Sequence, residues 1–436
     1  MEVREARARY LVKPGIKQTE VGTTPSDWEA KQLRDFQPFV TSGSRGWAAY
    51  YSEIGAPFIR ITNLSRESIY PDLADTRYVS VPPNDVEGIR TRLRTGDVLI
   101  SITADIGIVG YVSDESPTPA YINQHIALVR FNPLEVCPKY ISYFLASGDS
   151  QKAFQALTDS GAKSGMNLTT VSNIWAALPP TVEEQQAIAD ALGGADALIE
   201  SLEHLLAKKR QIKQGTMQAL LTGQLRLPGF EGEWEDKSLI ELAQGKKELF
   251  DDGDWVEAEH IVSSGIRLVQ TGNIGVGRFL EKDDRKYVSE SSFVSLRCKQ
   301  IHKGDLLICR LADPAGRACV LPDIEEERMI TSVDVTIFRP SEDEIDRRFL
   351  ANVFSATAWF QAVSDRCGGT THKRISRNSL GQIRLKLPPL AEQTAIATVL
   401  ADMDAEIAAL DAKLAKARAL KQGMMQTLLT GRIRLV

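Results

Sequence analysis

The chain has 436 residues, too many for one ordinary hydrophobic core, so we expect roughly two to four domains. Hydrophobic residues make up 43% of it and charged residues 25%, and no run of about 18 apolar residues could span a membrane. The net charge of −5 counts only mildly against a nucleic-acid binder, because such a protein needs no more than a local basic face.

Cysteine and histidine usage excludes further classes of site. The five cysteines are scattered without any CxxC, which argues against a disulfide framework and a zinc site, and no HExxH occurs. We therefore expect no metal. The beginning, "MEVREARARY", is charged where a secretory signal needs an apolar stretch, so we expect a cytoplasmic protein.

Residues 1–178 have the pattern of a mixed α/β domain. "GDVLISI" at 96–102 and "IALVRF" at 126–131 predict strands rich in branched apolar residues, and "YISYFLAS" at 140–147 predicts a helix. Residues 228–386 repeat this order with "GDLLICR" at 304–310, "VTIFRP" at 335–340 and "FLANVFSA" at 349–356. We expect two domains that share a frame and differ in their loops.

Residues 179–227 and 387–436 are expected to form two long helices. Alignment of Glu184 with Glu392 gives 25 identities in 44 positions, and "LLTG" occurs at 220–223 and 428–431. A capping box, Thr181-x-x-Glu184, predicts the beginning of the first helix. The two helices are expected to end at Gly223 and Gly431. About 38 residues give a rod of roughly 57 Å.

Apolar residues step by four and three along both segments, which is the seam of a coiled coil. The seam residues are Ile188, Leu192, Ala195, Ile199, Leu202 and Leu206 in the first copy, and Ile396, Leu400, Met403, Ile407, Leu410, Leu414 and Ala417 in the second. Because a lone helix with such a stripe is unstable in water, we expect an antiparallel pair within the chain. Gly193-Gly194 predicts a bend or a close crossing.

Identity between the helices extends to polar positions, and on sequence grounds packing inside the pair does not require it. The alternatives are a pure scaffold and a face that each copy presents to the same kind of partner. The candidate partner-binding residues are Lys208, Arg210, Lys213, Gln214, Lys416, Arg418, Lys421 and Gln422. If those faces bind a partner, neutralising Lys213 and Lys421 is expected to weaken docking.

The sequence contains no catalytic motif that we would assign. "SGAKSG" at 160–165 lacks the GxxxxGK[ST] frame of a phosphate loop, and the Pro-Pro pairs lie outside the Asn/Asp/Ser-Pro-Pro-aromatic corner of adenine methyltransferases. The acid-x-Lys fragments of "DWEAK" and "EWEDK" lack a third acid. We expect a chain without catalytic residues.

Side chains suited to DNA occur at corresponding places in both halves. Arg, Gln and Asn can make paired contacts to guanine or adenine edges, and basic loops can contact phosphates; the alternative for each is a solvated charge or a turn residue. "IRTRLR" at 89–94 is expected to place three arginines on one side of an extended stretch. The candidates are Arg60, Asn63, Arg90, Arg92, Arg94, Lys163, Ser164 and Asn167 in the first half, and Gln270, Asn273, His372, Lys373, Arg374 and Arg377 in the second.

"LPPTVEEQQAIADAL" at 178–192 and "LPPLAEQTAIATVL" at 387–400, with the "KQG" to "LLTG" helix ends, resemble the specificity (S) subunit of Type I restriction–modification systems. The resemblance spans nearly the whole chain. It implies an α+β fold with two target recognition domains, each reading half of a split DNA site, separated by an antiparallel coiled coil. It also implies that the helices dock two methyltransferase subunits and that a restriction/translocase subunit can join.

In this resemblance the methyltransferase subunits bring S-adenosylmethionine and methylate adenine, while this chain holds no cofactor. Two rivals remain open from the sequence. One is a coiled-coil adaptor that binds proteins rather than DNA, and the other is a self-contained DNA enzyme.

Overall fold

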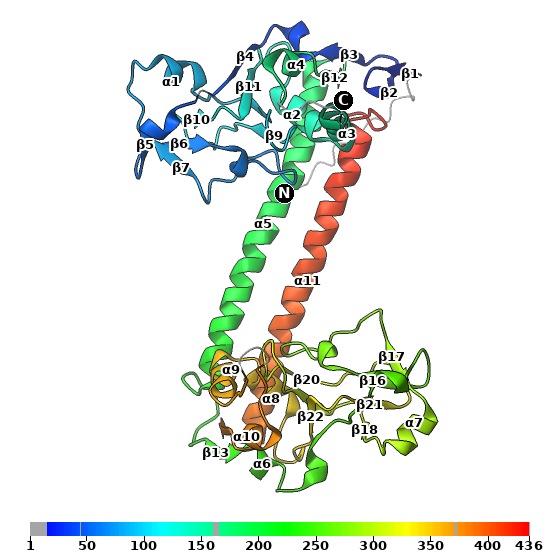
Figure 1. The fold of residues 1–436 in the computed structure, drawn as a ribbon. Helices are drawn as coiled ribbons and strands as arrows, with labels where there is room; N and C mark the ends of the chain where they lie inside the picture. Colours follow the sequence, from blue (N-terminus) through cyan, green and yellow to red (C-terminus); the bar gives the residue numbers. More distant parts are fainter. Residues whose placement is uncertain (1–14, 44, 160–164, 370–372, 436) are drawn as a thin grey trace, which may run out of the picture. The chain divides into compact units, whose positions relative to one another are not determined.

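The computed structural model describes residues 15–43, 45–159, 165–369 and 373–435 (Figure 1). The chain divides into two compact units, which we call the first unit (Met1–His204 with Asp411–Val436) and the second unit (Leu205–Leu410). Each unit contains one of the predicted α/β domains together with parts of both long helices. The predicted α+β repeat is confirmed.

The first unit is built on an antiparallel sheet in the order β4-β11-β8-β9, and its second sheet has the order β10-β6-β7-β5. Its strands are β1 (Ile16–Thr19), β2 (Gly22–Pro25), β3 (Glu29–Gln32), β4 (Phe39–Ser42), β5 (Tyr51–Ser52), β6 (Ala56–Ile59), β7 (Arg77–Val79), β8 (Val98–Ser101), β9 (Val109–Tyr111), β10 (Tyr121–Ile122), β11 (Ile126–Arg130) and β12 (Trp175–Leu178). Its short helices are α1 (Val86–Thr91), α2 (Pro138–Ala146), α3 (Gly148–Asp159) and α4 (Leu168–Ser172). The predicted strands and helix of this domain are confirmed.

Strand β8 is apolar at nearly every position because both of its faces are buried. Val98 and Ile100 belong to the core shared with α2 and the long helices, whereas Leu99 belongs to the core shared with the second sheet. A strand covered on both sides shows a continuous hydrophobic run instead of alternation. The sheet is therefore the middle layer of the domain.

The second unit repeats this arrangement, with sheets in the orders β14-β22-β19-β20 and β15-β17-β16-β21-β18. Its strands are β13 (Glu235–Ser238), β14 (Phe250–Asp252), β15 (Ile261–Val262), β16 (Ile266–Val269), β17 (Lys286–Val288), β18 (Gln300–Ile301), β19 (Leu306–Cys309), β20 (Ala318–Val320), β21 (Met329–Thr331), β22 (Val335–Phe338) and β23 (Arg384–Leu387). Its short helices are α6 (Leu239–Leu242), α7 (Glu290–Ser295), α8 (Arg347–Val353), α9 (Thr357–Ser364) and α10 (Arg377–Gly381).

The "GD" that opens β8 and β19 makes a tight turn and a buried ion pair. Gly96 and Gly304 have φ of 86° and 88°, a conformation that favours glycine. Asp97 is fully buried and accepts two hydrogen bonds from Arg130, at 2.6 and 2.7 Å. Because the same pair recurs in the second unit between Asp305 and Arg339, the repeat is maintained by electrostatics as well as by apolar packing.

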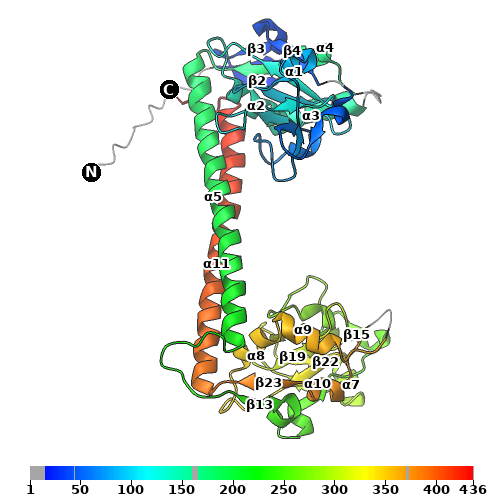
Figure 2. The same cartoon turned by 90° about the vertical axis from the view of Figure 1, so that its left-hand side faces the viewer.

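The long helices α5 (Val182–Leu221) and α11 (Leu390–Leu428) lie side by side and run antiparallel (Figures 1 and 2), as predicted. They fall inside the predicted spacers 179–227 and 387–436. The seam positions Ile188, Leu192, Ile396 and Leu400 are completely buried, because the first turns of each helix also pack into the core of a domain.

The structure corrects one local expectation for α5 and decides between the two alternatives of another. The Thr181 hydroxyl accepts a hydrogen bond from the Glu184 backbone at 3.2 Å, but the Glu184 carboxylate bonds to Arg434 instead of completing a capping box. Gly193 and Gly194 do not interrupt the helix. A Cβ on Gly193 would lie 2.6 Å from Nζ of Lys139, so this glycine permits a close approach.

Candidate nucleic-acid interface

Loops of the first unit converge where β8 ends. The backbone N–H of Ile102 donates to the carbonyl of His125 at 2.9 Å, and the carbonyl of Ile102 accepts from the N–H of Met166 at 2.7 Å. The segments before β11 and before α4 are thereby joined to the end of one strand. We call this arrangement the loop frame of the unit.

The second unit contains the same loop frame at the end of β19. The N–H of Arg310 donates to the carbonyl of Asp334 at 2.8 Å, and its carbonyl accepts from the N–H of Ile375 at 3.0 Å. The two frames are equivalent in backbone and differ in side chains. This confirms, in residue detail, the expectation of a common scaffold with different loops.

Threonine, glutamine and histidine side chains occupy the frame of the first unit. His125 Nδ1 forms a hydrogen bond with the Thr103 hydroxyl, and its Nε2 lies 2.9 Å from the Gln124 amide nitrogen. All three side chains are half-buried. They are donors and acceptors held at the edge of the domain, which is what contact with base edges requires.

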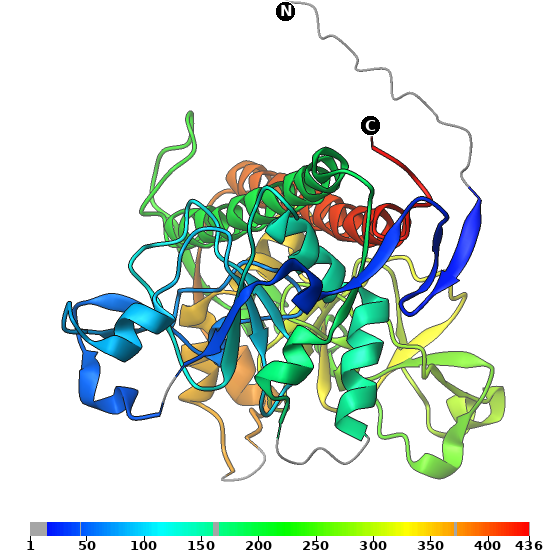
Figure 3. The ribbon, with the colours of Figure 1, turned by 90° about the horizontal axis from the view of Figure 1, so that it is seen from above.

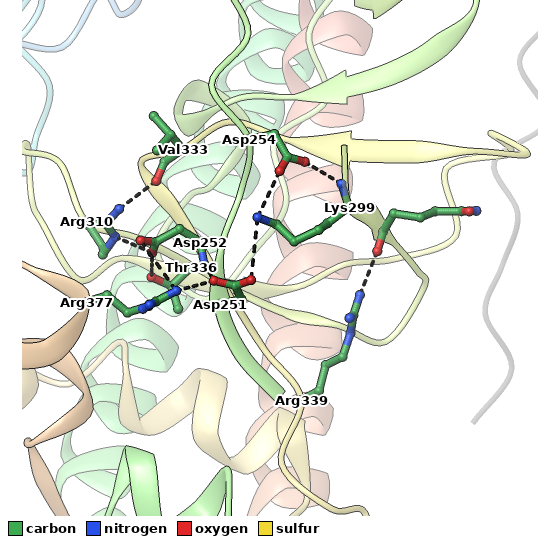
Figure 4. Close-up of polar contacts among 10 residues, drawn as sticks. Asp251, Asp252, Asp254, Lys299, Arg310, Val333, Thr336, Arg339 and Arg377 are labelled. Carbon is green, nitrogen blue, oxygen red and sulfur yellow. Dashed lines mark hydrogen bonds and ion pairs between the residues drawn. The ribbon is translucent and has the colours of Figure 1, made fainter. Parts of the chain in front are cut away.

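Charged groups occupy the frame of the second unit (Figure 4). Arg310 is almost completely buried, and its guanidinium contacts the Asp252 carboxylate at 3.1 Å and the Val333 carbonyl at 2.7 Å. Burial lowers the pKa of Arg310, an effect that Asp252 opposes. Arg377 pairs with Asp251. These contacts tie β14, the segment before β22 and the start of α10 to one another.

The corresponding residues Asn63 and Asn273 have a structural role. Both are buried, and each side-chain oxygen accepts a hydrogen bond from the backbone N–H three residues earlier, at Arg60 and Gln270, at 2.9 Å. Each amide nitrogen donates to a carbonyl of the following loop. Their recurrence in both halves therefore reflects a shared turn, and we leave both out of the interface.

The side chain of Arg60 donates to the Asp75 carbonyl at 2.8 Å, so it too is engaged within its domain, while Gln270 is half-buried. The stretch "IRTRLR" begins inside α1, which corrects the expectation of three arginines on one extended stretch. Arg90 lies in α1 and bonds to Thr41, Ser42 and Glu87, whereas Arg92 and Arg94 are exposed.

The candidates in the two basic loops have three outcomes. Lys163, Ser164 and His372 lie outside the described residues. Asn167 is exposed, but its side-chain oxygen caps α4 by accepting from Thr170 at 2.8 Å. Lys373 is exposed, and Arg374 is half-exposed and paired with Asp334 at 2.7 Å. Arg377 forms an ion pair with Asp251, so its charge is compensated within the unit.

The structure corrects the interpretation of two helix lysines. Lys421 is buried and pairs with Asp196 at 2.6 Å in the first unit, and Lys213 pairs with Asp404 in the second. In the alignment of the helices Lys213 matches Lys421 and Asp196 matches Asp404, so one ion pair is formed twice, reciprocally. Pairing between the helices, and not a partner, accounts for the identity at these positions.

Other helix candidates remain at the surface. Lys208, Gln214, Lys416 and Gln422 are exposed, and their side chains form no hydrogen bond or ion pair with any residue that the structure describes. Arg210 is exposed as well, and Arg418 contacts Glu203 at 2.5 Å.

The family model described as "Type I restriction modification DNA specificity domain" matches residues 25–214 and 231–417. The chain belongs to this family. It is 26% identical over 439 aligned residues, 98% of both chains, to the type I restriction enzyme MjaX specificity subunit of Methanocaldococcus jannaschii. It is 27% identical over 285 residues to the MjaVIII specificity subunit of that organism, which covers 60% of this chain and 63% of the relative.

Solved structures of low sequence identity share the fold. The S subunit of the M. genitalium Type I system has a TM-score of 0.57 at 13% identity, covering 92% of this chain and 96% of that one. A chain from a study of complex assembly and conformational transition of the type I R-M system has a TM-score of 0.53 at 17% identity, covering 94% and 99%.

The specificity subunit also contains a repeated joint that the sequence did not reveal. Arg434, just after "LLTG", donates to the Glu184 carboxylate at 2.6 Å and lies 5.9 Å from the ring of Trp28. Arg226 does the same with Glu392 and Trp234 in the second unit. The motifs that form it, "W-E-x-K", "EQ" and "LLTG", are visible in both halves of the sequence. Their contacts could not be predicted because they join distant parts of the chain.

This joint explains the position of the last described residues. Gly431 lies against Pro25 and Trp28, and the C-terminal segment runs beside β2 in Figure 3. Glu184 raises the pKa of Arg434 through their hydrogen bond. The second half of the "EQ" motif is also structural, because Gln185 accepts from the Cys137 backbone at 2.9 Å at the start of α2.

Two other kinds of site are absent from the described residues. They contain no group of three or more His, Cys, Asp or Glu side chains that could hold a metal ion. Among them, no helix is long and apolar enough to cross a membrane.

Proposed function

We propose that the two domains of this specificity subunit each read one half of a bipartite DNA site, using the side chains at their loop frames. The observation that carries the proposal is the frame itself: one backbone arrangement, present twice, bears threonine, glutamine and histidine in one unit and arginine–aspartate pairs in the other. Two readers of unlike sequences require such a combination, because base discrimination depends on side chains while positioning depends on the scaffold.

The paired helices, in this proposal, hold the two readers at a fixed offset and dock two modification (methyltransferase) subunits. Continuous helices of 40 and 39 residues, joined by reciprocal ion pairs, form a stiff spacer. Readers that both use the major groove of one face need half-sites about 34 Å apart, one helical turn. The exposed Lys208 and Lys416, at equivalent places on the two helices, are suited to contact the two subunits.

The chemistry belongs to the partners. The modification subunits would bring S-adenosylmethionine and methylate adenine, and a restriction/translocase subunit would join them. The specificity subunit would supply no catalytic residue and bind no cofactor, and the complex would act on double-stranded DNA in the cytoplasm.

Binding of DNA at different salt concentrations tests this proposal against an adaptor that contacts only proteins. Filter binding would use the subunit together with its modification subunits and a pool of genomic duplex fragments. Contacts to phosphates make the logarithm of the affinity fall linearly with the logarithm of salt, by about 0.9 per phosphate contacted. Retention that falls in this way supports the proposal; absent or salt-independent retention supports the adaptor. Cleavage or methylation by the purified subunit alone would favour a self-contained enzyme.

A further inference from the structure

Arg374 differs from the other cations at the loop frame of the second unit. Its backbone is fixed on both sides, because its N–H donates to the carbonyl of Gly368 and its carbonyl accepts from the N–H of Gly368, both at 3.0 Å. It also forms a bridge with Leu311, just beyond the end of β19. The Cα of Arg374 is thus held on the frame, at the base of the loop.

The guanidinium of Arg374 is oriented by one ion pair and keeps N–H donors available for a ligand. One of its terminal nitrogens, Nη2, lies 2.7 Å from Oδ1 of Asp334, and the side chain remains 46% exposed. This contact is an ion pair, and the described residues accept no hydrogen bond from any of the five N–H donors of the guanidinium. By contrast, Arg310 is only 4% exposed and bonded to two carbonyls and a carboxylate.

The carboxylate that orients Arg374 is itself positioned by the frame. The backbone carbonyl of Asp334 accepts the hydrogen bond from Arg310 that defines the frame. Asp334 therefore lies beside the end of β19, and its carboxylate orients the Arg374 guanidinium from a fixed position. An arginine held in this way loses little side-chain entropy when it binds a ligand.

The first unit lacks this pair. In the equivalent frame, Gly165 stands where the second unit has Arg374, and His125 stands where it has Asp334. Gly165 has φ of 90°, and a Cβ there would lie 2.6 Å from the carbonyl oxygen of Ile102. No larger side chain fits that backbone without a shift, so the difference between the two readers is built in.

We propose that Arg374 is a base-reading residue of the second unit, that it pairs through two N–H groups with a guanine in the major groove, and that Asp334 positions it. The proposal rests on the proposed function. Arginine bonded to O6 and N7 of guanine is the commonest specific contact to a base in DNA complexes. The half-site of the second unit would therefore contain one guanine whose recognition depends on Arg374, with no equivalent in the other half-site.

The test is selection of bound sequences by the full complex. The specificity subunit and its modification subunits would be incubated with a pool of duplexes carrying 40 random base pairs, and the bound fraction would be sequenced. Wild type should select two blocks, and Arg374→Ala should lose a guanine preference of roughly 5- to 150-fold at one position of one block. Arg374→Gln should move that preference towards adenine, which glutamine can contact through N6 and N7.

A matched control is Arg348→Ala. Arg348 is another exposed arginine of the second unit, paired with Asp346 at 2.6 Å on α8, away from the frame. It should leave both blocks unchanged. Asp334→Asn should keep the guanine but weaken its selection, and Asp334→Asn should have no further effect on the selected sequence in an Arg374→Ala background.

The outcomes separate this assignment from the function beneath it. A bipartite wild-type motif that Arg374→Ala and Arg374→Gln leave unchanged overturns the role of Arg374 alone. Equal loss of both blocks in these variants, with unchanged circular dichroism, also overturns it, because it would make Arg374 a general contact. A wild-type complex that selects no bipartite motif overturns the proposed function itself.

Discussion

Removing Arg434 should loosen the joint of the first unit. Its partner Glu184 is almost completely buried. The Arg434 side chain is 12% exposed and forms a second ion pair with Asp27 at 2.8 Å. A surface pair contributes up to about 1 kcal/mol and loss of one partner of a fully buried pair costs about 3–5 kcal/mol. For this geometry we expect Arg434→Ala to cost about 2 kcal/mol, between those limits.

Hydrogen exchange followed by mass spectrometry can localise that loss. An opening easier by about 2 kcal/mol speeds exchange about 30-fold, which should appear in β2, β3 and the first turns of α5. Arg432→Ala is the control, because Arg432 is exposed in the same segment. Exchange unchanged by Arg434→Ala, or accelerated equally in the second unit, would refute the idea of a local joint. Arg226→Ala should affect only the second unit.

Other expectations concern the helices and the thiols. Lys421→Met should lower the free energy of unfolding by about 2 kcal/mol in urea denaturation, because the largely buried Asp196 loses its cation and keeps only the hydrogen bond from Tyr143. Lys213→Met should cost less than about 1 kcal/mol, and equal losses would contradict the difference in burial. Burial raises the pKa of Cys319 to about 12, which leaves about one thiolate in ten thousand at pH 8, so iodoacetamide should label half-buried Cys367 first and Cys319 only after unfolding. Lys208→Glu with Lys416→Glu should reduce co-purification with modification subunits at an unchanged melting temperature; full assembly would count against docking at those faces.

The sequence was sufficient for the architecture because the architecture depends on periodic patterns. The four-and-three spacing of apolar residues predicted α5 and α11, and the continuous apolar runs after "GD" predicted β8 and β19. The antiparallel direction followed from the domain between the two helices, which lets the chain turn round. These features are local or repeat at a constant shift, so they can be read without knowing distant contacts.

Side-chain roles were not predictable because they depend on partners far apart in the chain. Lys213 and Lys421 looked like partner-binding residues, since nothing local shows that their partners are Asp404 and Asp196. Asn63 looked like a base-reading residue because it recurs as Asn273 in the second half. In sequence, a residue repeated for a structural contact cannot be distinguished from one repeated for a DNA contact. Only the folded structure separates a repeated structural contact from a repeated functional one.

Methylation mapping in cells tests the central claim most directly. DNA from cells that express the specificity subunit with its modification subunits would be sequenced by a single-molecule method that detects methylated adenines. Two specified blocks separated by an unspecified spacer of constant length, with one methylated adenine on each strand, are the expected result. A single continuous motif, or methylation without any sequence preference, would contradict the reading of one bipartite site by two domains.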